Sequence, residues 1–153
     1  MNLLHNNTLG IDIGSTTVKI AVLDSEQHIL FTDYERHYAN IQETLALLLS
    51  KAKEKLGEMT VSPSITGSGG LTLSGHLNVP FTQEVVAVAT ALQDYAPQPD
   101  VAIELGGEDA KIIYFTGGID QRMNGICAGG TGSFIDQMAS LLQTDAAGLN
   151  EYA

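Results

Sequence analysis

Apolar and β-branched residues dominate both sides of a short Gly-Ser-Thr-Thr segment near the start of the chain. The run Leu9 to Leu23, LGIDIGSTTVKIAVL, therefore predicts a strand, a tight turn and a second strand. A polar turn at residues 24–27 follows, and the run Ile29 to Tyr34 predicts a third strand. Because each strand would return beside the one before it, the pattern predicts an antiparallel meander.

Helical periodicity follows the meander. Between Asn40 and Leu56, apolar residues recur three and four positions apart, which predicts a helix. Asn40 is the expected N-cap, with Glu43 three residues later, and Gly57 is the expected end.

A second strand and helix pattern precedes a proline-rich stretch. Residues 64–66 predict a short strand that enters the turn Gly67-Ser68-Gly69-Gly70, and the run Gln83 to Tyr95 predicts a helix. The stretch Pro97-Gln98-Pro99 ends that helix, and we interpret it as the domain boundary.

The segment Val101 to Phe115, VAIELGGEDAKIIYF, repeats the layout of the first hairpin. When the first copy is moved forward by 92 positions (104 − 12), Asp12 falls on Glu104 and Lys19 on Lys111, with no gap. Each copy thus has an acidic residue at the end of one strand, glycine in the turn and lysine on the next strand. Two hairpins of similar composition could agree by chance. The interpretation we prefer is a duplicated domain that faces itself across a ligand.

Composition and charge narrow the possible ligands. The 153 residues, 44% of them hydrophobic, suffice for one ordinary domain or two small ones with a real core. The net charge of −11 disfavours nucleic acid and anionic membranes as partners. No apolar run approaches the roughly 18 residues of a membrane span, and the first residues lack a signal-peptide pattern. We therefore expect a cytoplasmic protein, in which a polyphosphate ligand would need main-chain N–H groups or a metal ion.

The two turns have the residues that phosphate binding requires. Glycine lets the main chain approach a phosphate without a Cβ in the way, and the N–H groups that follow can converge on its oxygens. Asp12 ends its strand where a carboxylate could hold the waters of Mg²⁺, and Glu104 would do the same from the opposite side. The competing phosphate motifs, GxxxxGK[ST] and GxGxxG, are absent from the sequence.

The run GIDIGSTTVK resembles the first phosphate motif of the actin, Hsp70 and hexokinase superfamily, and IELGGEDAK resembles its second. This resemblance implies an α/β protein with a ribonuclease-H-like, actin/Hsp70-type ATPase fold, in which duplicated βββαβα lobes hold ATP in a cleft. Residues 1–82 would form the first lobe, 83–100 a connecting helix and linker, and 101–153 the first part of an incomplete second lobe. Glu84 falls where members carry a polar group near the attacking water. An exposed glutamate favoured by the helix dipole is the other interpretation.

Cys127, the single cysteine, lies in a glycine-rich run that precedes the amphipathic stretch 135–142. The N-terminus of a helix favours anions, so it would favour a thiolate and a bound anionic cluster. A small buried hydrophobe is the ordinary interpretation of an isolated cysteine.

The run ICAGGTGSFIDQM resembles the cysteine motif of the BadF/BadG/BcrA/BcrD family, and TGSGG resembles that family's TGYGR segment. These ATPases activate 2-hydroxyacyl-CoA dehydratases and benzoyl-CoA reductases. The resemblance implies a homodimer with one [4Fe–4S] cluster at its interface, where ATP hydrolysis drives a low-potential electron into the partner dehydratase. Cys127 would be one of the two cysteines that each subunit provides. Because the family's second cysteine lies further downstream, we expect this chain to be the N-terminal portion of a longer protein.

The residues implied for the site lie in four regions of the sequence: the two turns with their flanking strands, the connecting helix and the cysteine loop. The resemblance implies Asp12, Glu84 and Glu104 as catalytic residues, Asp12 as the Mg²⁺ ligand, Cys127 as the cluster ligand, and Gly14, Ser15, Thr16, Thr17, Lys19, Gly106, Gly107, Glu108 and Lys111 as ATP-binding residues.

Two other functions stay open at this point. One is a small-molecule kinase of the sugar-kinase or acetate-kinase type, in which Cys127 is only packed. The other is a non-catalytic nucleotide-binding scaffold. His5, His28, His37 and His76 lack ligand-like spacing, and we interpret them as surface or packing residues.

Overall fold

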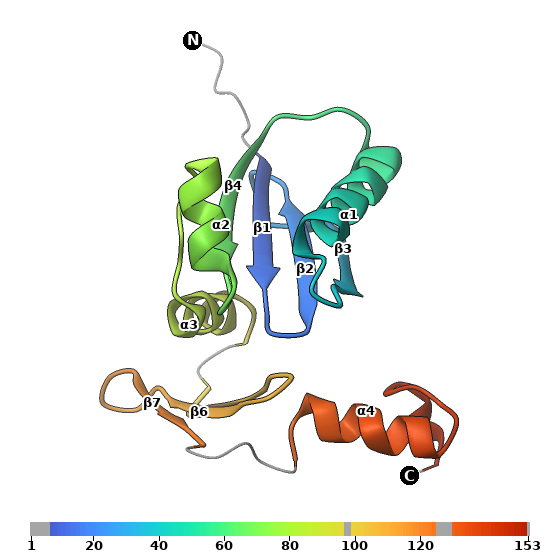
Figure 1. Cartoon of the computed structure of the whole chain (residues 1–153). Helices are drawn as coiled ribbons and strands as arrows, with labels where there is room; N and C mark the ends of the chain where they lie inside the picture. Colours follow the sequence, from blue (N-terminus) through green and yellow to red (C-terminus); the bar gives the residue numbers. More distant parts are fainter. Residues whose placement is uncertain (1–6, 97–98, 125–129, 153) are drawn as a thin grey trace. The chain divides into compact units, whose positions relative to one another are not determined.

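The computed structural model describes residues 7–96, 99–124 and 130–152, so the expected role of Cys127 falls outside the described residues. The chain divides into two compact units, Met1–Ala87 and Val88–Ala153. Each unit contains its own β-sheet (Figure 1).

The first unit is built on a four-stranded sheet with the strand order β3-β2-β1-β4 (Figure 1). Strands β1 (Asn7–Ile13), β2 (Thr17–Leu23) and β3 (Ile29–Arg36) form the antiparallel meander that the sequence predicts. Strand β4 (Val61–Thr66) joins β1 in parallel. Because side chains alternate between the faces of a strand, one face of β1 and β2 carries the buried residues Leu9, Ile11, Ile13, Val18, Ile20 and Val22.

Helix α1 (Ile41–Leu56) covers that buried face. Its Leu45, Leu48 and Ala52 pack into one core with the alternate apolar residues of the sheet, and Leu48 has no exposed surface. Asn40 precedes the helix as expected, but its side chain makes no capping hydrogen bond. Instead, the hydroxyl of Thr44 donates to the main-chain oxygen of Asn40 at 2.8 Å.

Helix α2 (Gly70–Leu77) is an element that the sequence pattern does not predict. Its two glycines lower its intrinsic helix propensity, so the sequence indicates only a turn there. Tertiary packing explains the helix, because Gly70 is buried and a Cβ there would lie 2.8 Å from the Ile65 side chain. Helix α3 (Glu84–Tyr95) begins one residue after its predicted start.

The second unit contains the three-stranded sheet β5-β6-β7, formed by β5 (Val101–Leu105), β6 (Ala110–Tyr114) and β7 (Asp120–Met123). All neighbouring strands are antiparallel, and Glu104 pairs with Lys111 in the register that Asp12 and Lys19 share. Helix α4 (Gly132–Leu141) and a short 3-10 helix, η1 (Gly148–Glu151), follow. Since β7 and α4 each begin 91 positions after β3 and α1, the repeat extends beyond the two hairpins aligned in the sequence.

With 16 residues, α1 is the longest helix in the described part of the chain. No helix there is both long enough and apolar enough to cross a membrane.

Candidate functional site

The turn between β1 and β2 is closed by its own main chain. The N–H of Gly14 donates to the oxygen of Thr17 at 2.9 Å. Between these residues, the N–H groups of Ser15 and Thr16 donate to no other group in the part of the chain that the structure describes. Ser15 is exposed and Thr16 is partly exposed. The turn therefore presents two main-chain donors that an anionic ligand could accept.

Asp12 is the last residue but one of β1, directly opposite Lys19 on β2 and beside Thr66 on β4. Lys19 Nζ lies 2.8 Å from Asp12 Oδ2, and the two side chains are 54% and 29% exposed. An ion pair this exposed adds only about 0–1 kcal/mol to stability. The pair therefore places a carboxylate near the end of the strand, within reach of solvent.

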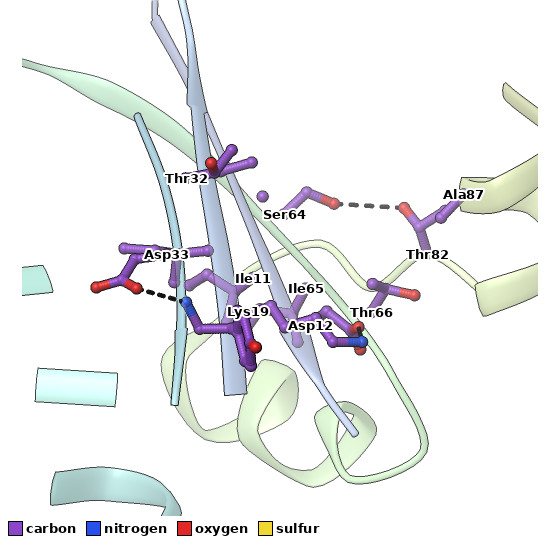
Figure 2. A pocket seen from close by; sticks show the side chains of 14 residues that line it. Ile11, Asp12, Lys19, Thr32, Asp33, Ser64, Ile65, Thr66, Thr82 and Ala87 are labelled. Carbon is purple, nitrogen blue, oxygen red and sulfur yellow. Dashed lines mark hydrogen bonds and ion pairs between the residues drawn. The ribbon is translucent and has the colours of Figure 1, made fainter. Parts of the chain in front are cut away.

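A cavity of about 660 Å³ opens on the sheet face that carries Asp12 and Lys19 (Figure 2). The hydroxyls of Ser64 and Thr82, 3.3 Å apart, border another part of it (Figure 2). Its volume lies within the range of roughly 300–1,000 Å³ usual for small-molecule sites. The lining residues come from the four strands, the segment after α2 and the start of α3: Gly10, Ile11, Asp12, Lys19, Ile20, Ala21, Thr32, Asp33, Tyr34, Ser64, Ile65, Thr66, Thr82 and Ala87.

The segment after β4 packs directly onto the first turn. The N–H of Gly69 donates to the oxygen of Ile13 at 2.9 Å. Gly67 has a φ of +95°, and a Cβ there would lie 2.5 Å from Asp12 Oδ1 and closer still to the Ile13 oxygen. Only glycine accommodates both the backbone conformation and this close approach. The glycines of the TGSGG run thus explain how β4 can end against the Asp12 carboxylate.

The connection from β3 to α1 holds the first turn from another side. His37 is 9% exposed, its main-chain N–H donates to the Thr16 oxygen at 3.2 Å, and its ring nitrogen Nε2 lies 3.2 Å from the Gly14 oxygen. The interpretation of His37 as a surface or packing residue missed this contact. Histidine spacing could not indicate it, because 23 residues separate His37 from Gly14 and the meander brings them together.

The turn between β5 and β6 is closed by the same main-chain hydrogen bond as the first turn. The N–H of Gly106 donates to the oxygen of Asp109 at 2.8 Å, which is the Gly14 to Thr17 bond moved by 92 positions. Glu104 Oε1 lies 3.1 Å from Lys111 Nζ, and the side chains are 29% and 11% exposed. The other carboxylate oxygen, Glu104 Oε2, is buried and lacks a partner among the described residues.

The start of α4 is bonded to this second turn. Gly132 N–H donates to the Gly106 oxygen at 2.8 Å, and Ser133 N–H donates to the Gly107 oxygen at 2.9 Å. The hydroxyls of Thr131 and Ser133 also donate to the Gly107 oxygen. N–H groups in the first turn of a helix have no partner within the helix, so these bonds satisfy them. These bonds join the start of α4 directly to the second turn.

The donor set in each unit suits a metal-bound phosphate better than a metal ion alone. Among the described residues, no three His, Cys, Asp or Glu side chains cluster to hold a metal. Mg²⁺ commonly takes one or two carboxylates and completes its shell with water and phosphate oxygens. Within the same residues, the two buried side-chain polar atoms that lack a partner are Thr66 Oγ1 and Glu104 Oε2. Thr66 is the last residue of β4 and Glu104 the last but one of β5, so each atom lies beside one of the turns.

The expected site residues fall into separate groups in the structure. Asp12, Gly14, Ser15, Thr16, Thr17 and Lys19 gather at the first turn, and Glu104, Gly106, Gly107, Glu108 and Lys111 gather at the second. Glu84 is the first residue of α3 and is not among the residues that line the cavity beside Asp12. Thr66 and His37 are two site neighbours that the sequence analysis does not identify.

Comparison with known proteins gives consistent matches. Residues 9–152 match the BadF/BadG/BcrA/BcrD ATPase family. The (R)-2-hydroxyglutaryl-CoA dehydratase activating ATPase of Acidaminococcus fermentans is 30% identical over 149 residues, which cover 94% of this chain and 56% of that protein. The activator of lactoyl-CoA dehydratase from Anaerotignum propionicum is 32% identical over 144 residues, with coverage of 90% and 54%.

A solved structure agrees with these sequence matches. The activator of the 2-hydroxyisocaproyl-CoA dehydratase from Clostridium difficile with bound ADPNP shares the fold with a TM-score of 0.79 at 27% identity. The match covers 94% of this chain and 55% of that one, so the chain spans a little over half the length of its relatives. The α/β fold of the actin/Hsp70 type, expected from the two phosphate motifs, is confirmed. By its sequence over residues 9–152 and by its fold, this chain belongs to the BadF/BadG/BcrA/BcrD ATPase family.

Proposed function

We propose that this chain is the nucleotide-binding portion of an ATP-dependent activator of a 2-hydroxyacyl-CoA dehydratase or a related CoA-substrate enzyme. The observation that carries the proposal is the pair of matching turns, each closed by the same glycine N–H bond beside an acid–lysine pair. Relatives that are activators of such dehydratases by name support the choice of partner.

Mg-ATP fits the residues present at both turns. In the proposal, the N–H groups of Ser15 and Thr16 bind phosphate oxygens, while Asp12 holds waters of Mg²⁺ and Lys19 neutralises phosphate charge. At the second turn, Glu104 and Lys111 take the corresponding roles, together with the main chain of Gly106, Gly107 and Glu108. The bound ADPNP of the Clostridium difficile activator supports a nucleotide as the ligand, since ADPNP is an analogue of ATP. Positioning and charge stabilisation supply most of the catalysis in phosphoryl transfer.

The proposed function also includes electron transfer to the partner dehydratase. Cys127 would give one thiolate to a [4Fe–4S] cluster in a homodimer. A bound cluster would supply a low-potential electron for the partner dehydratase. Because this sequence has one cysteine, a cluster with four cysteine ligands needs two further thiolates from outside these 153 residues even in a dimer. Glu84 is the proposed polar group near the attacking water, and the cytoplasm is the proposed compartment.

The experiment that tests this function uses the complete protein, purified without oxygen. We expect bound iron and sulfide with visible cluster absorption in the wild type, and loss of all three in Cys127→Ala. His76→Asn is the control, because the bond of the His76 ring in the described part of the chain is to the Thr72 oxygen of its own helix, at 2.8 Å. A wild type that binds Mg-ATP but contains no iron would reject the activator and favour a kinase of the same fold.

A further inference from the structure

We propose that His37 positions the first turn for phosphate binding by fixing the carbonyl of Gly14, and thereby the direction of the Ser15 N–H. This inference rests on the proposed nucleotide site. In this role His37 does not touch the nucleotide: it acts through the main chain of the turn.

The hydrogen bonds of His37 determine which ring nitrogen carries the proton. The main-chain N–H of Ala39 donates to Nδ1 at 3.0 Å, so Nδ1 must be the unprotonated acceptor. A neutral imidazole then carries its hydrogen on Nε2, which lies 3.2 Å from the Gly14 oxygen and donates to it. The main-chain N–H of His37 adds a bond to the Thr16 oxygen. One nearly buried residue therefore holds the two carbonyls on either side of Ser15.

Peptide geometry links the direction of the Gly14 carbonyl to the direction of the Ser15 N–H. The Gly14 carbonyl and the Ser15 N–H belong to one planar trans peptide unit, so the two groups point in opposite directions. Since the imidazole fixes the carbonyl on its side of the turn, the Ser15 N–H must point away from His37. That N–H donates to no other described group, and Ser15 is exposed. The ring of His37 thus orients one of the two donors assigned to phosphate.

The second unit holds the equivalent carbonyl by a different group. Gly106 stands 92 positions after Gly14, and its oxygen accepts the N–H of Gly132 at 2.8 Å. The same oxygen of the same turn is therefore fixed twice in the molecule, once by an imidazole and once by the start of a helix. This recurrence indicates that a fixed carbonyl is a requirement of the turn and not a chance contact of His37.

Two isosteric substitutions separate the bonds of His37. A glutamine amide nitrogen lies near the Nε2 position and keeps the donor to Gly14, whereas an asparagine amide oxygen lies near Nδ1 and keeps only the acceptor for Ala39. The complete protein is prepared as wild type, His37→Gln, His37→Asn, His37→Ala and the control His76→Asn. Calorimetry then measures the Kd for Mg-ATP, and thermal unfolding measures Tm.

We expect His37→Asn and His37→Ala to weaken Mg-ATP binding about tenfold, and His37→Gln to stay within about twofold of wild type. Three results would overturn the inference: His37→Asn binding like wild type, His37→Gln binding as weakly as His37→Ala, or affinity falling only in proportion to Tm across the series. If the wild type itself binds no Mg-ATP, the proposed function fails, and this inference fails with it. If the wild type binds Mg-ATP and all variants bind it with the same affinity, the positioning role of His37 is rejected and the proposed nucleotide site is not.

Discussion

Glu104 Oε1 forms an ion pair with Lys111 Nζ at 3.1 Å. The second carboxylate oxygen, Glu104 Oε2, is buried without a partner in the described part of the chain. Burial of an unpartnered carboxylate oxygen costs free energy, on the order of 1–3 kcal/mol. The matching carboxylate at the first turn, Asp12, is paired at 2.8 Å with a lysine that is far more exposed. The two acid–lysine pairs therefore differ in how strongly folding depends on them.

Glu104→Gln should lower both stability and ATP hydrolysis. The substitution removes the charge of the carboxylate that pairs with Lys111, a side chain only 11% exposed, so we expect a loss of about 1–3 kcal/mol in unfolding free energy. Removal of a group that stabilises the transition state should slow hydrolysis by about 10²–10³. Urea unfolding and steady-state turnover measure the two effects. The double variant Glu104→Gln with Lys111→Met should recover stability and not hydrolysis, because it removes the largely buried charge and also the second residue assigned to the phosphate site. Recovered hydrolysis would remove Glu104 from the site.

Asp12→Ala should abolish Mg-ATP hydrolysis while changing the unfolding free energy by only about 0–1 kcal/mol, because its ion pair with Lys19 is exposed. Glu35→Ala is the matched control. Glu35 is also a partly exposed strand carboxylate paired with a lysine, 2.6 Å from Lys51 Nζ, but that lysine belongs to α1 and Glu35 is not among the residues that line the cavity beside Asp12. Turnover and thermal unfolding of both variants test the prediction. Equal turnover in Asp12→Ala and Glu35→Ala would mean that the first turn has been assigned wrongly.

Local patterns predict the meander, α1 and the second hairpin because their signals lie within single segments. Alternating apolar residues, a glycine turn and helical spacing each depend on neighbours a few positions apart. The 92-residue repeat also predicts the register, since Asp12 opposite Lys19 becomes Glu104 opposite Lys111. The acid, the turn and the lysine of each candidate site therefore follow from sequence.

Contacts between distant segments are what the sequence did not predict. Helix α2 contains two glycines and forms because Gly70 packs against Ile65, which depends on how β4 enters the core. The bonds of His37 to the first turn, and of Thr131 to the second, join residues 23 and 24 positions apart. Such contacts depend on the closed fold, so a pattern of residue types does not contain them.

Asp24 should make stability depend on acid pH. The main-chain N–H groups of His28 and Glu26 donate to Asp24 Oδ1 at 2.9 and 2.8 Å. These bonds lower the pKa of Asp24 below its usual value of 3.8, and the bond from His28 has the larger effect. A carboxyl whose pKa is lowered by folding stabilises the folded state above its unfolded pKa, and the effect is lost as pH falls through the folded pKa. Asp24→Asn should therefore have a lower Tm than wild type at pH 7, and the difference should shrink below pH 3.8. A Tm difference between Asp24→Asn and wild type that is as large below pH 3.8 as at pH 7 would contradict this role of Asp24.

Gly67→Ala should destabilise the first unit and disturb the site at the same time. A Cβ at this position meets the Ile13 oxygen and Asp12 Oδ1 in a backbone of positive φ, so the chain must shift or unfold. We expect a loss of about 2–4 kcal/mol, combining the strained conformation with the steric clash. Gly57→Ala is the control, since Gly57 has a φ of +79° and a Cβ there meets nothing within 4 Å. It should cost about 1 kcal/mol. Equal losses in urea unfolding would show that the close approach to Asp12 adds nothing.

The bonds between the second turn and α4 should couple nucleotide binding to that helix. Thr131 is 2% exposed, and its hydroxyl donates to the Gly107 oxygen at 3.1 Å, beside the bonds from Ser133. Thr131→Val keeps the shape and removes the donor, and Ser133→Ala removes the second hydroxyl, each at a cost of about 1 kcal/mol. Hydrogen exchange of α4 amides in the complete protein should slow when Mg-ATP binds the wild type, and slow less in the double variant.

Ser140→Ala provides the matched control, because Ser140 is an exposed residue of α4 remote from the turn. It should leave the nucleotide-dependent protection of α4 unchanged, and exchange in β1 to β4 should be the same in every variant. Protection of α4 that persists in full without both hydroxyls would mean that the main-chain bonds of Gly132 and Ser133 suffice to join the helix to the turn. Protection that is absent even in the wild type, with Mg-ATP bound, would show that the second turn does not move α4.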